Sequence, residues 1–314
     1  MPANLKDLRT RIKSVKNTQQ ITKAMKLVSA AKFGRAQNNV LQARPYARAL
    51  EKLVLNLVNT RRDSDAHALL QGKESDTALL LVISSERGLC GGYNSNTIKA
   101  ALRAVDELVA AGKKPVVLCV GKKAFQVLSR RPLAGGVKGN KQVSLQEFLN
   151  DPAKFVSENA NSVAHLGVVF DRPNFDFAQS MASAIESAFA QGAVGEVHCV
   201  YNQFQSAMTQ IPVFEKLLPL ASETEEQAAA SDIILEPSWS ELANAMLPRY
   251  LATRFYQLTL EAIASEHGAR MTAMDNATRN AKDMERRLQI TYQRARQAAI
   301  TRELIEIISG AEAL

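Results

Sequence analysis

A glycine-rich turn at residues 87–92, Arg-Gly-Leu-Cys-Gly-Gly, has the residue types that come nearest to a site for chemistry. It follows an apolar run of strand length and precedes a helical pattern, the context in which backbone amides bind phosphate. Its spacing is not that of the G-x-G-x-x-G fingerprint, however, and no Gly-Lys-Ser/Thr follows as in a P-loop. We interpret it as a tight strand-to-helix turn in which glycine supplies positive φ angles. A degenerate nucleotide-binding enzyme is an alternative.

No other group of residues suggests catalysis. The sequence has no G-x-S-x-G, no H-E-x-x-H and no paired carboxylates that would supply a nucleophile, a base and an oxyanion donor. The cysteines and histidines lack metal-ligand spacing: Cys90, Cys119, Cys199, His67, His165, His198 and His267. An odd number of separated cysteines is typical of buried thiols in a reducing compartment. We therefore expect no intrinsic catalysis, no metal and no cofactor.

Positive charge is concentrated near the N-terminus. The 314 residues carry a net charge of +8, and the first sixty hold twelve Lys and Arg against only Asp7 and Glu51. Such a helix presents either a solvated face or a surface for an acidic partner. A basic nucleic-acid-binding helix is a further alternative, although its charges surround an apolar seam that a helix lying in a groove would not need.

The composition indicates a soluble intracellular protein. Hydrophobic residues make up 46% of the chain, an ordinary share. No apolar run approaches the roughly eighteen residues of a membrane span. The first residues are basic and amphipathic, as in a transit peptide, but the pattern continues from Leu5 without a cleavage-like break, so we expect mature protein.

Two very long helices are predicted at the ends, from about Leu5 to Val58 and from about Glu241 to Ile308. At ~1.5 Å per residue either one could reach on the order of 70 to 90 Å. Ser238 is the expected N-cap of the second helix and Gly310 its expected stop. Pro45 is expected to kink or restart the first. Neither helix can bury its apolar stripe alone, so we expect them to pair antiparallel.

The stripes themselves can be read from the spacing of apolar residues. The N-terminal stripe is predicted at Leu5, Leu8, Ile12, Val15, Ile21, Met25 and Val28. The C-terminal stripe is predicted at Leu251, Phe255, Leu258, Ala262, Met274, Ala277, Ala281, Met284, Leu288, Tyr292, Ala295, Ala299, Ile305 and Ile308. Spacings of three and four residues are those of a coiled-coil seam.

The middle of the chain alternates strand and helix patterns. Strands are predicted at 78–83, 116–120 and 166–170, helices at 94–111, 122–128 and 176–190, and a hairpin at 195–201 and 208–214. This alternation predicts an α/β fold with a mostly parallel sheet. The expected domains are an N-terminal coiled-coil helix at 1–60, a central α/β domain at 76–236 and a C-terminal coiled-coil helix at 238–314. The polar, Gly-rich loop Arg130–Ser144 receives no interpretation.

Three ordered motifs carry a family resemblance. Residues 17–32 (NTQQITKAMKLVSAAK), 85–94 (SERGLCGGYN) and 294–311 (RARQAAITRELIEIISGA) resemble segments of the γ subunit of F-type ATP synthases. The resemblance implies a central Rossmann-like foot domain and an antiparallel coiled coil that enters a hexamer of α and β subunits. It implies a central-stalk rotor subunit that couples proton-driven rotation of the c-subunit ring to distant catalytic sites, without chemistry or a cofactor of its own.

The resemblance also implies partners, location and contact residues. The partners are the α, β and ε subunits and the c ring, without nucleic acid, in a complex peripheral to the cytoplasmic face of a bacterial inner membrane. The implied contacts with the hexamer are Lys23, Met25, Lys26, Arg270, Arg296, Gln297, Thr301 and Glu306, with Lys32 as a further charge. The implied ring-side contacts, within 201–210, are Tyr201, Asn202, Gln203 and Phe204. Met25 is a seam residue as well.

One departure from the family has a consequence. Chloroplast members resemble this sequence but carry an inserted loop with two cysteines that act as a redox switch. The region around Cys199 has a single cysteine and no such insertion. We therefore expect no thiol control of rotation.

Overall fold

The computed structural model describes residues 5–60, 67–130, 138–143, 145–166, 174–220 and 235–312. They form seven helices and six strands in the described ranges. The helices are α1 (Leu5–Asn59), α2 (Tyr93–Ala110), α3 (Lys122–Leu128), α4 (Leu145–Asn150), α5 (Pro152–Glu158), α6 (Phe175–Ala190) and α7 (Trp239–Glu312). The strands are β1 (Thr77–Ile83), β2 (Lys114–Val120), β3 (Lys138–Val143), β4 (Ser162–Leu166), β5 (Glu196–Phe204) and β6 (Gln210–Leu218).

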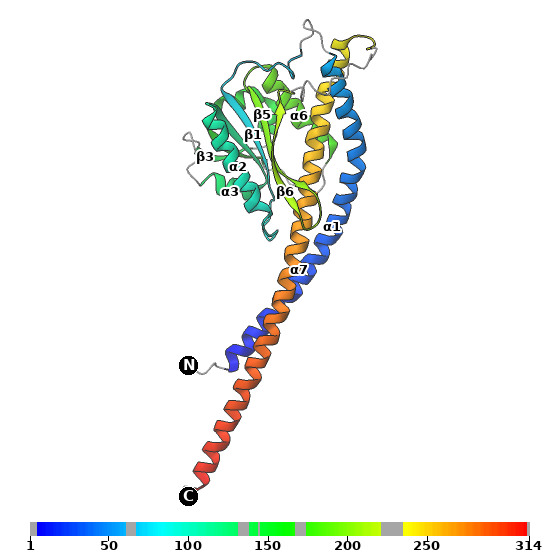
Figure 1. The fold of residues 1–314 in the computed structure, drawn as a ribbon. Helices are drawn as coiled ribbons and strands as arrows, with labels where there is room; N and C mark the ends of the chain where they lie inside the picture. Colours follow the sequence, from blue (N-terminus) through cyan, green and yellow to red (C-terminus); the bar gives the residue numbers. More distant parts are fainter. Residues whose placement is uncertain are drawn as a thin grey trace. The chain divides into compact units, whose positions relative to one another are not determined.

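The chain divides into two compact units. One unit holds residues 1–31 and 270–314, and the other holds residues 32–269. Helices α1 and α7 contribute to both, and in each unit they run antiparallel (Figure 1). The predicted pairing of the two terminal helices is therefore found in each unit taken by itself.

The larger unit is built on one six-stranded sheet in the order β3-β4-β2-β1-β5-β6. Its pairs are parallel except β5 with β6, which is antiparallel. Strands β1 and β2 are buried along nearly their whole length, because helices cover both faces of the sheet. Burial on both faces explains why these strands are continuous apolar runs. This arrangement confirms the predicted α/β fold with a mostly parallel sheet.

Each face of the sheet has its own core. Alternate β1 residues, Ala78, Leu80 and Val82, join the buried residues of α2 and α3 on one face. On the other face Leu79, Leu81 and Ile83 join a larger core to which α6 and α7 contribute, with Leu50, Val54 and Leu57 of α1. At about 25 cal/mol per Å² of buried apolar surface, this two-sided burial is the main stabilisation of the unit.

Several predicted boundaries need correction. Helix α1 passes Pro45 without a restart, because proline removes only one hydrogen bond while Ala47 and Leu50 beyond it are buried. Helix α7 continues two residues beyond Gly310, the expected stop. Strand β4 begins at Ser162 and ends at Leu166, so most of the expected strand 166–170 lies outside the described residues. The predicted N-cap is confirmed: the Ser238 hydroxyl oxygen accepts from the Glu241 amide over 3.3 Å.

The uninterpreted loop Arg130–Ser144 contains a strand. Residues 138–143 form β3, which pairs in parallel with β4 and has a register shift between Gly139 and Lys141. Its sequence, Lys-Gly-Asn-Lys-Gln-Val, lacks the apolar run that identified the central strands. An edge strand has one neighbour only and needs less apolar character, which is why the pattern missed it.

Candidate functional site

The helix pair of the smaller unit follows a strict heptad. On α1 the buried or half-buried positions alternate in steps of four and three from Leu8: Leu8, Ile12, Val15, Gln19, Thr22, Lys26 and Ser29. On α7 the same steps give Met274, Thr278, Ala281, Glu285, Leu288, Tyr292, Ala295 and Ala299. This 3.5-residue repeat is that of a left-handed coiled coil. The seam that it defines is apolar where Leu8 and Ile12 lie at the level of Leu288 and Tyr292, and it becomes mostly polar from Gln19 to Ser29.

The predicted stripe on α1 was therefore wrong at Ile21 and Val28, whereas the predicted Met25 is half-buried. Ile21 and Val28 are 60% and 59% exposed, whereas Thr22 and Ser29 are buried. The heptad that begins at Leu8 continues through Thr22 and Ser29, and the apolar residues one position earlier turn outward. The signal was present in the sequence as an unbroken seven-residue spacing, but apolar character was followed instead. On α7, Met284 is likewise exposed.

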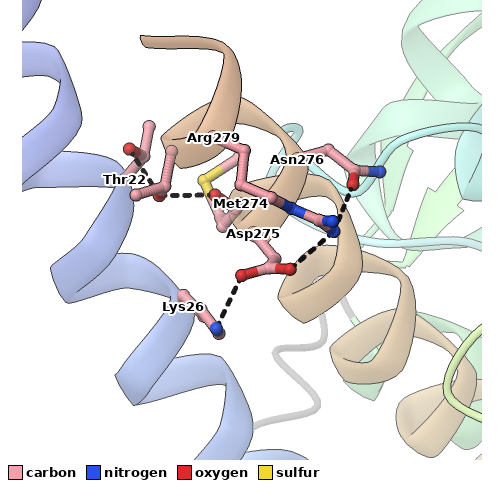
Figure 2. Close-up of polar contacts among 7 residues, drawn as sticks. Thr22, Lys26, Met274, Asp275, Asn276 and Arg279 are labelled. Carbon is pink, nitrogen blue, oxygen red and sulfur yellow. Dashed lines mark hydrogen bonds and ion pairs between the residues drawn. The ribbon is translucent and has the colours of Figure 1, made fainter. Parts of the chain in front are cut away.

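Directional contacts cross the seam at three levels. The Arg9 guanidinium donates to the Tyr292 hydroxyl over 2.7 Å. The hydroxyls of Thr22 and Thr278 are 2.9 Å apart, and Lys26 Nζ lies 2.6 Å from Asp275 Oδ1 (Figure 2). Partners rise along one helix as they fall along the other, which is the register of an antiparallel pair.

Asp275 is held by two cations. Its second oxygen, Oδ2, accepts from Arg279 over 2.7 Å, one turn further along α7, and Arg279 also donates to the Asn276 side chain (Figure 2). The hydrogen bond from Lys26, with a smaller contribution from Arg279, lowers the pKa of the Asp275 carboxyl. The carboxylate is thus charged at neutral pH. Sequence reasoning missed Thr22, Asp275 and Thr278.

The predicted hexamer contacts lie in the smaller unit and most are exposed. Lys23 is exposed and Met25 and Arg270 are half-buried. Lys26 is engaged by Asp275 within the chain. Farther along α7, four more predicted contacts are all exposed: Arg296, Gln297, Thr301 and Glu306. The Thr301 hydroxyl donates to the Gln297 carbonyl oxygen over 3.0 Å, a bond within the helix.

The last three turns of α7 carry exposed apolar side chains: Ile300, Leu304, Ile305, Ile307 and Ile308. Every described side chain from residue 300 to 311 is exposed. The predicted seam residues Ile305 and Ile308 therefore do not lie in a seam within this chain. Contiguous apolar surface on a helix is typical of a surface that another protein covers.

The predicted ring-side residues lie mostly inside the larger unit. Tyr201, Asn202 and Phe204 are buried, and only Gln203 is half-buried. The Asn202 amide donates to the Thr97 hydroxyl over 2.6 Å. The side chains of β5 point to the two faces of the sheet, where Tyr201 and Phe204 join cores with residues of α7 and Asn202 contacts α2, which is why they are buried. These three side chains are structural in this chain, and the exposed part of 201–210 is the hairpin tip, where Met208 is 81% exposed.

The glycine-rich turn is closed by the chain itself. The Ser85 hydroxyl donates to the Arg87 carbonyl oxygen or to Asn94 Oδ1, at 2.6 and 2.9 Å, and the Asn94 amide donates to Cys90 Sγ over 3.1 Å. Gly91 has φ +57°, as expected of a tight turn, but the second left-handed residue is Leu89, at +64°. We therefore retain the interpretation of a structural turn.

Helix α7 fills the crevice at the carboxyl ends of β1 and β5. Between these strands the order of the sheet reverses, the place where open α/β sheets bind ligands. Here the buried Tyr93 hydroxyl donates to the Ala262 carbonyl oxygen over 3.2 Å. The Ser265 hydroxyl donates to the Asn202 carbonyl oxygen over 3.0 Å. The Ala262 carbonyl and the Ser265 hydroxyl both belong to the part of α7 in the larger unit. Helix α7 therefore occupies the place where a ligand would bind in such a sheet.

Metal and thiol chemistry can be judged for the described residues. Among them, no three His, Cys, Asp or Glu side chains are grouped to hold a metal ion. Cys90, Cys119 and Cys199 are buried thiols, as predicted, and burial raises the pKa of Cys119 and of Cys199. Within the same ranges, none of the helices combines the length and apolar character of a membrane span.

Comparison with known proteins gives consistent matches. A family model described as ATP synthase matches residues 4–314. The ATP synthase gamma chain of Geotalea daltonii is 42% identical over 313 residues, which are 99% of each chain. That of Fuscovulum blasticum is 44% identical over 315 residues, covering both chains completely.

Solved structures share the fold. A chain in the Euglena gracilis mitochondrial ATP synthase (OSCP/F1/c-ring) is 20% identical, with a TM-score of 0.62, covering 98% of this chain and 94% of that one. A chain in the Tetrahymena thermophila mitochondrial ATP synthase central stalk/c-ring is 24% identical, with a TM-score of 0.55, covering 82% and 99%. With a family model that matches almost the whole chain and relatives more than 40% identical from end to end, this chain belongs to the ATP synthase gamma chain family.

Proposed function

We propose that this chain is the central-stalk rotor subunit of a proton-translocating ATP synthase and has no catalytic activity of its own. It couples rotation of a membrane ring of c subunits to conformational change at catalytic sites in a head of α and β subunits. The observation that carries the proposal is the antiparallel helix pair of the smaller unit, within a chain of this family. Coupling of this kind requires only that each position of the rotor favours one conformation of a distant site.

The first hexamer contact is assigned to the outer side of α1. Ile21 and Val28 are exposed and Met25 is half-buried between them, at spacings of four and three residues that place them on one face. Lys23 and Lys32 add positive charge to the same stretch of α1. An acidic segment of a β subunit fits a surface of this kind. Partly solvated charge pairs are weak individually, which suits a contact that forms and breaks in every turn.

The second hexamer contact is assigned to the end of α7. Arg270 belongs to the half-buried part of the helix, whereas Arg296, Gln297, Thr301 and Glu306 are exposed. Beyond them the apolar side chains from Ile300 to Ile308 fit an apolar bearing in the hexamer. Apolar contact is not directional, so it holds the axis without favouring one angle.

The central domain is assigned to the foot. In this proposal residues 1–60 and 238–314 form the shaft and residues 76–236 form the foot that contacts the c ring and the ε subunit. The buried Tyr201, Asn202 and Phe204 support the hairpin from inside, and the exposed tip around Met208 supplies the ring-side surface with Gln203. The complex would place the chain peripherally at the cytoplasmic face of a bacterial inner membrane.

Neither alternative function is supported by a specific observation. The basic helix α1 engages Arg9 and Lys26 with α7, which a groove-binding helix would leave available. The crevice that a nucleotide would occupy in an α/β sheet holds α7. The rotor assignment therefore accounts for both features.

Co-purification tests the proposal. A tagged full-length chain, expressed in its own bacterium, is purified from detergent-solubilised membranes, and the co-purifying proteins are identified by mass spectrometry. We expect α, β, ε and c subunits, with ATP hydrolysis in the purified complex. A chain that is recovered without these subunits, bound to DNA in a salt-sensitive way or to nucleotide by itself, would overturn it.

A further inference from the structure

We propose that four side chains of the smaller unit, Thr22, Lys26, Asp275 and Thr278, form a polar layer that sets the register of α1 against α7 beside Met25. In this assignment Lys26 is a positioning residue within the rotor and not a hexamer contact. The consequence for coupling rests on the proposed function, whereas the register itself is a property of the chain alone.

The apolar seam is too weak at this level to set the register. Around the layer its α1 positions are Gln19, Thr22, Lys26 and Ser29, and the facing α7 positions are Met271, Met274, Thr278 and Ala281. The two methionines are the large apolar side chains among these eight described positions. Helices that slid past one another by a heptad would lose little apolar contact here. At this level directional contacts therefore discriminate between registers better than apolar packing does.

The two threonines supply a short and buried contact. Thr22 is buried, and its hydroxyl lies 2.9 Å from that of Thr278 (Figure 2). The Thr22 hydroxyl also lies 3.1 Å from the Gln19 carbonyl oxygen, and the Thr278 hydroxyl lies 2.7 Å from the Met274 carbonyl oxygen. Each hydroxyl has a single proton, so a bond across the seam forms when one of them donates to the other while the second donates to its own helix. Hydroxyls that meet across a seam require their backbones at one relative height. This contact fixes the level of the layer.

The ion pair between Lys26 and Asp275 favours the native register over a slipped one. Arg279 holds Oδ2 of Asp275 from its own helix, while Oδ1 points toward Lys26 (Figure 2). One heptad from Asp275 the chain has Lys282 in one direction and Gly268 in the other. A slipped register would thus place Lys26 opposite another cation or opposite no side chain. Half-exposed ion pairs stabilise little but can exclude wrong pairings in this way.

The layer is adjacent to the proposed contact surface. Met25 precedes Lys26 directly, and Lys23 lies one residue from Thr22. A partner that pushes on Met25 therefore pushes on the turn of α1 that the layer joins to α7. Rotor action needs this turn to move with α7 and not along it.

Disulfide trapping in the full-length chain measures the register. Gln19→Cys with Ala281→Cys reports the native register. Gln19 lies three residues before Thr22 and Ala281 three residues after Thr278, so the two positions face each other in an antiparallel pair. Gln19→Cys with Leu288→Cys reports a slip of one heptad. The three native cysteines are buried and do not compete. Each reporter pair is combined with Lys26→Arg, Lys26→Gln, Lys26→Glu, or the matched control Lys23→Glu at an exposed position of the same helix.

We expect the native cross-link to predominate, with a small and equal share of the slipped cross-link, in the unchanged chain, with Lys26→Arg and with Lys23→Glu. Lys26→Gln should raise the ratio of slipped to native cross-link about two- to fivefold, the range that exposed ion pairs give in double-mutant cycles. Lys26→Glu should raise it further, with helical circular dichroism unchanged. A native pattern with Lys26→Glu, or an equal shift with Lys23→Glu, would overturn the proposal.

The assembled enzyme separates the two proposals. Inverted membrane vesicles give the number of protons pumped per ATP hydrolysed for each Lys26 variant. We expect this ratio to fall with Lys26→Glu and to be restored with Lys26→Arg. A slipped register with an unchanged ratio would overturn the positioning role. A chain that never assembles with α and β subunits, even unchanged, would instead contradict the proposed function and leave the measured register standing.

Discussion

The hydroxyl of Tyr93 donates a hydrogen bond to the backbone carbonyl oxygen of Ala262 over 3.2 Å, inside the larger unit. Tyr93 is the first residue of α2 and belongs to the turn that the glycine-rich motif forms. Its ring is buried together with Cys90 and Ala269. The glycine-rich turn that suggested a ligand site therefore packs against α7 instead.

Removal of the Tyr93 hydroxyl tests how much its hydrogen bond to α7 contributes to stability. Tyr93→Phe should lower the free energy of unfolding by about 1 kcal/mol, because the Ala262 carbonyl keeps its helical partner and no buried group is left unpaired. Tyr93→Ala should cost about 3 to 5 kcal/mol, since it removes a buried ring. Urea unfolding followed by circular dichroism measures both. Equal losses of unfolding free energy in the two variants would show that packing of the Tyr93 ring does not stabilise the contact with α7.

Gly121 has no tolerance for a side chain. Its φ is +106°, and a Cβ there would clash with the backbone of Ser84. Gly121→Ala should lower the free energy of unfolding by about 3 kcal/mol, from left-handed backbone and overpacking together.

Gly112 offers the matched control. It also has a positive φ, +76°, but nothing lies within 4 Å of its Cβ position. Gly112→Ala should therefore cost only about 1 kcal/mol, the backbone share of the effect. Both variants are compared by urea unfolding of the full chain. Similar losses at the two positions would mean that the neighbouring Ser84 backbone gives way without cost.

The central fold could be predicted because its strands are continuous apolar runs. Residues 78–83 and 116–120 are buried on both faces, so burial alone gives the pattern, and helix 122–128 was predicted with its observed bounds. Strand β3 could not be found in this way, since it lies at the edge of the sheet and its partner is distant in sequence. The pairing that makes it a strand is a tertiary property.

The candidate site could be predicted only in part. That the terminal helices pair follows from their stripes, but Ile21 and Val28 are more apolar than Thr22 and Ser29, so local hydrophobicity selected the wrong face. The heptad phase set by Leu8, Ile12 and Val15 decides the seam over its whole length. Similarly, Tyr201 and Asn202 are buried because α7 and α2 cover the faces of β5, which no motif on the strand itself reveals.

Glu261 predicts a pH dependence of stability. Its side chain is 3% exposed, and burial raises the pKa of its carboxyl, an effect that Arg44 at 3.6 Å opposes in part. Because the folded pKa lies above the unfolded value of 4.5, the unfolded state releases this proton first. The contribution of Glu261 is therefore most favourable below that value and is lost as the pH rises through the folded pKa.

Glu261→Gln removes this titration. The free energy of unfolding of the variant, relative to the unchanged chain, should rise between pH 4 and pH 8, because only the unchanged chain must bury a charge at the higher pH. Glu266→Gln is the control at a neighbouring half-buried position of α7. Urea unfolding at a series of pH values gives both differences. A difference for Glu261→Gln that stays constant with pH would contradict the assignment.

The outward face of α1 gives the prediction that bears most directly on function. Ile21 and Val28 make no seam and are well exposed, so Ile21→Ser with Val28→Ser should leave helical content and thermal unfolding of the isolated chain nearly unchanged, as substitutions at exposed positions do. In membrane vesicles, the protons pumped per ATP hydrolysed should fall, because the proposed contact with the hexamer loses its apolar part. Leu41→Ser with Leu53→Ser is the matched control, since both residues are exposed on α1 but belong to the larger unit. A loss of coupling confined to the first pair places the working contact on this face, whereas equal coupling in both double variants would remove Ile21 and Val28 from it.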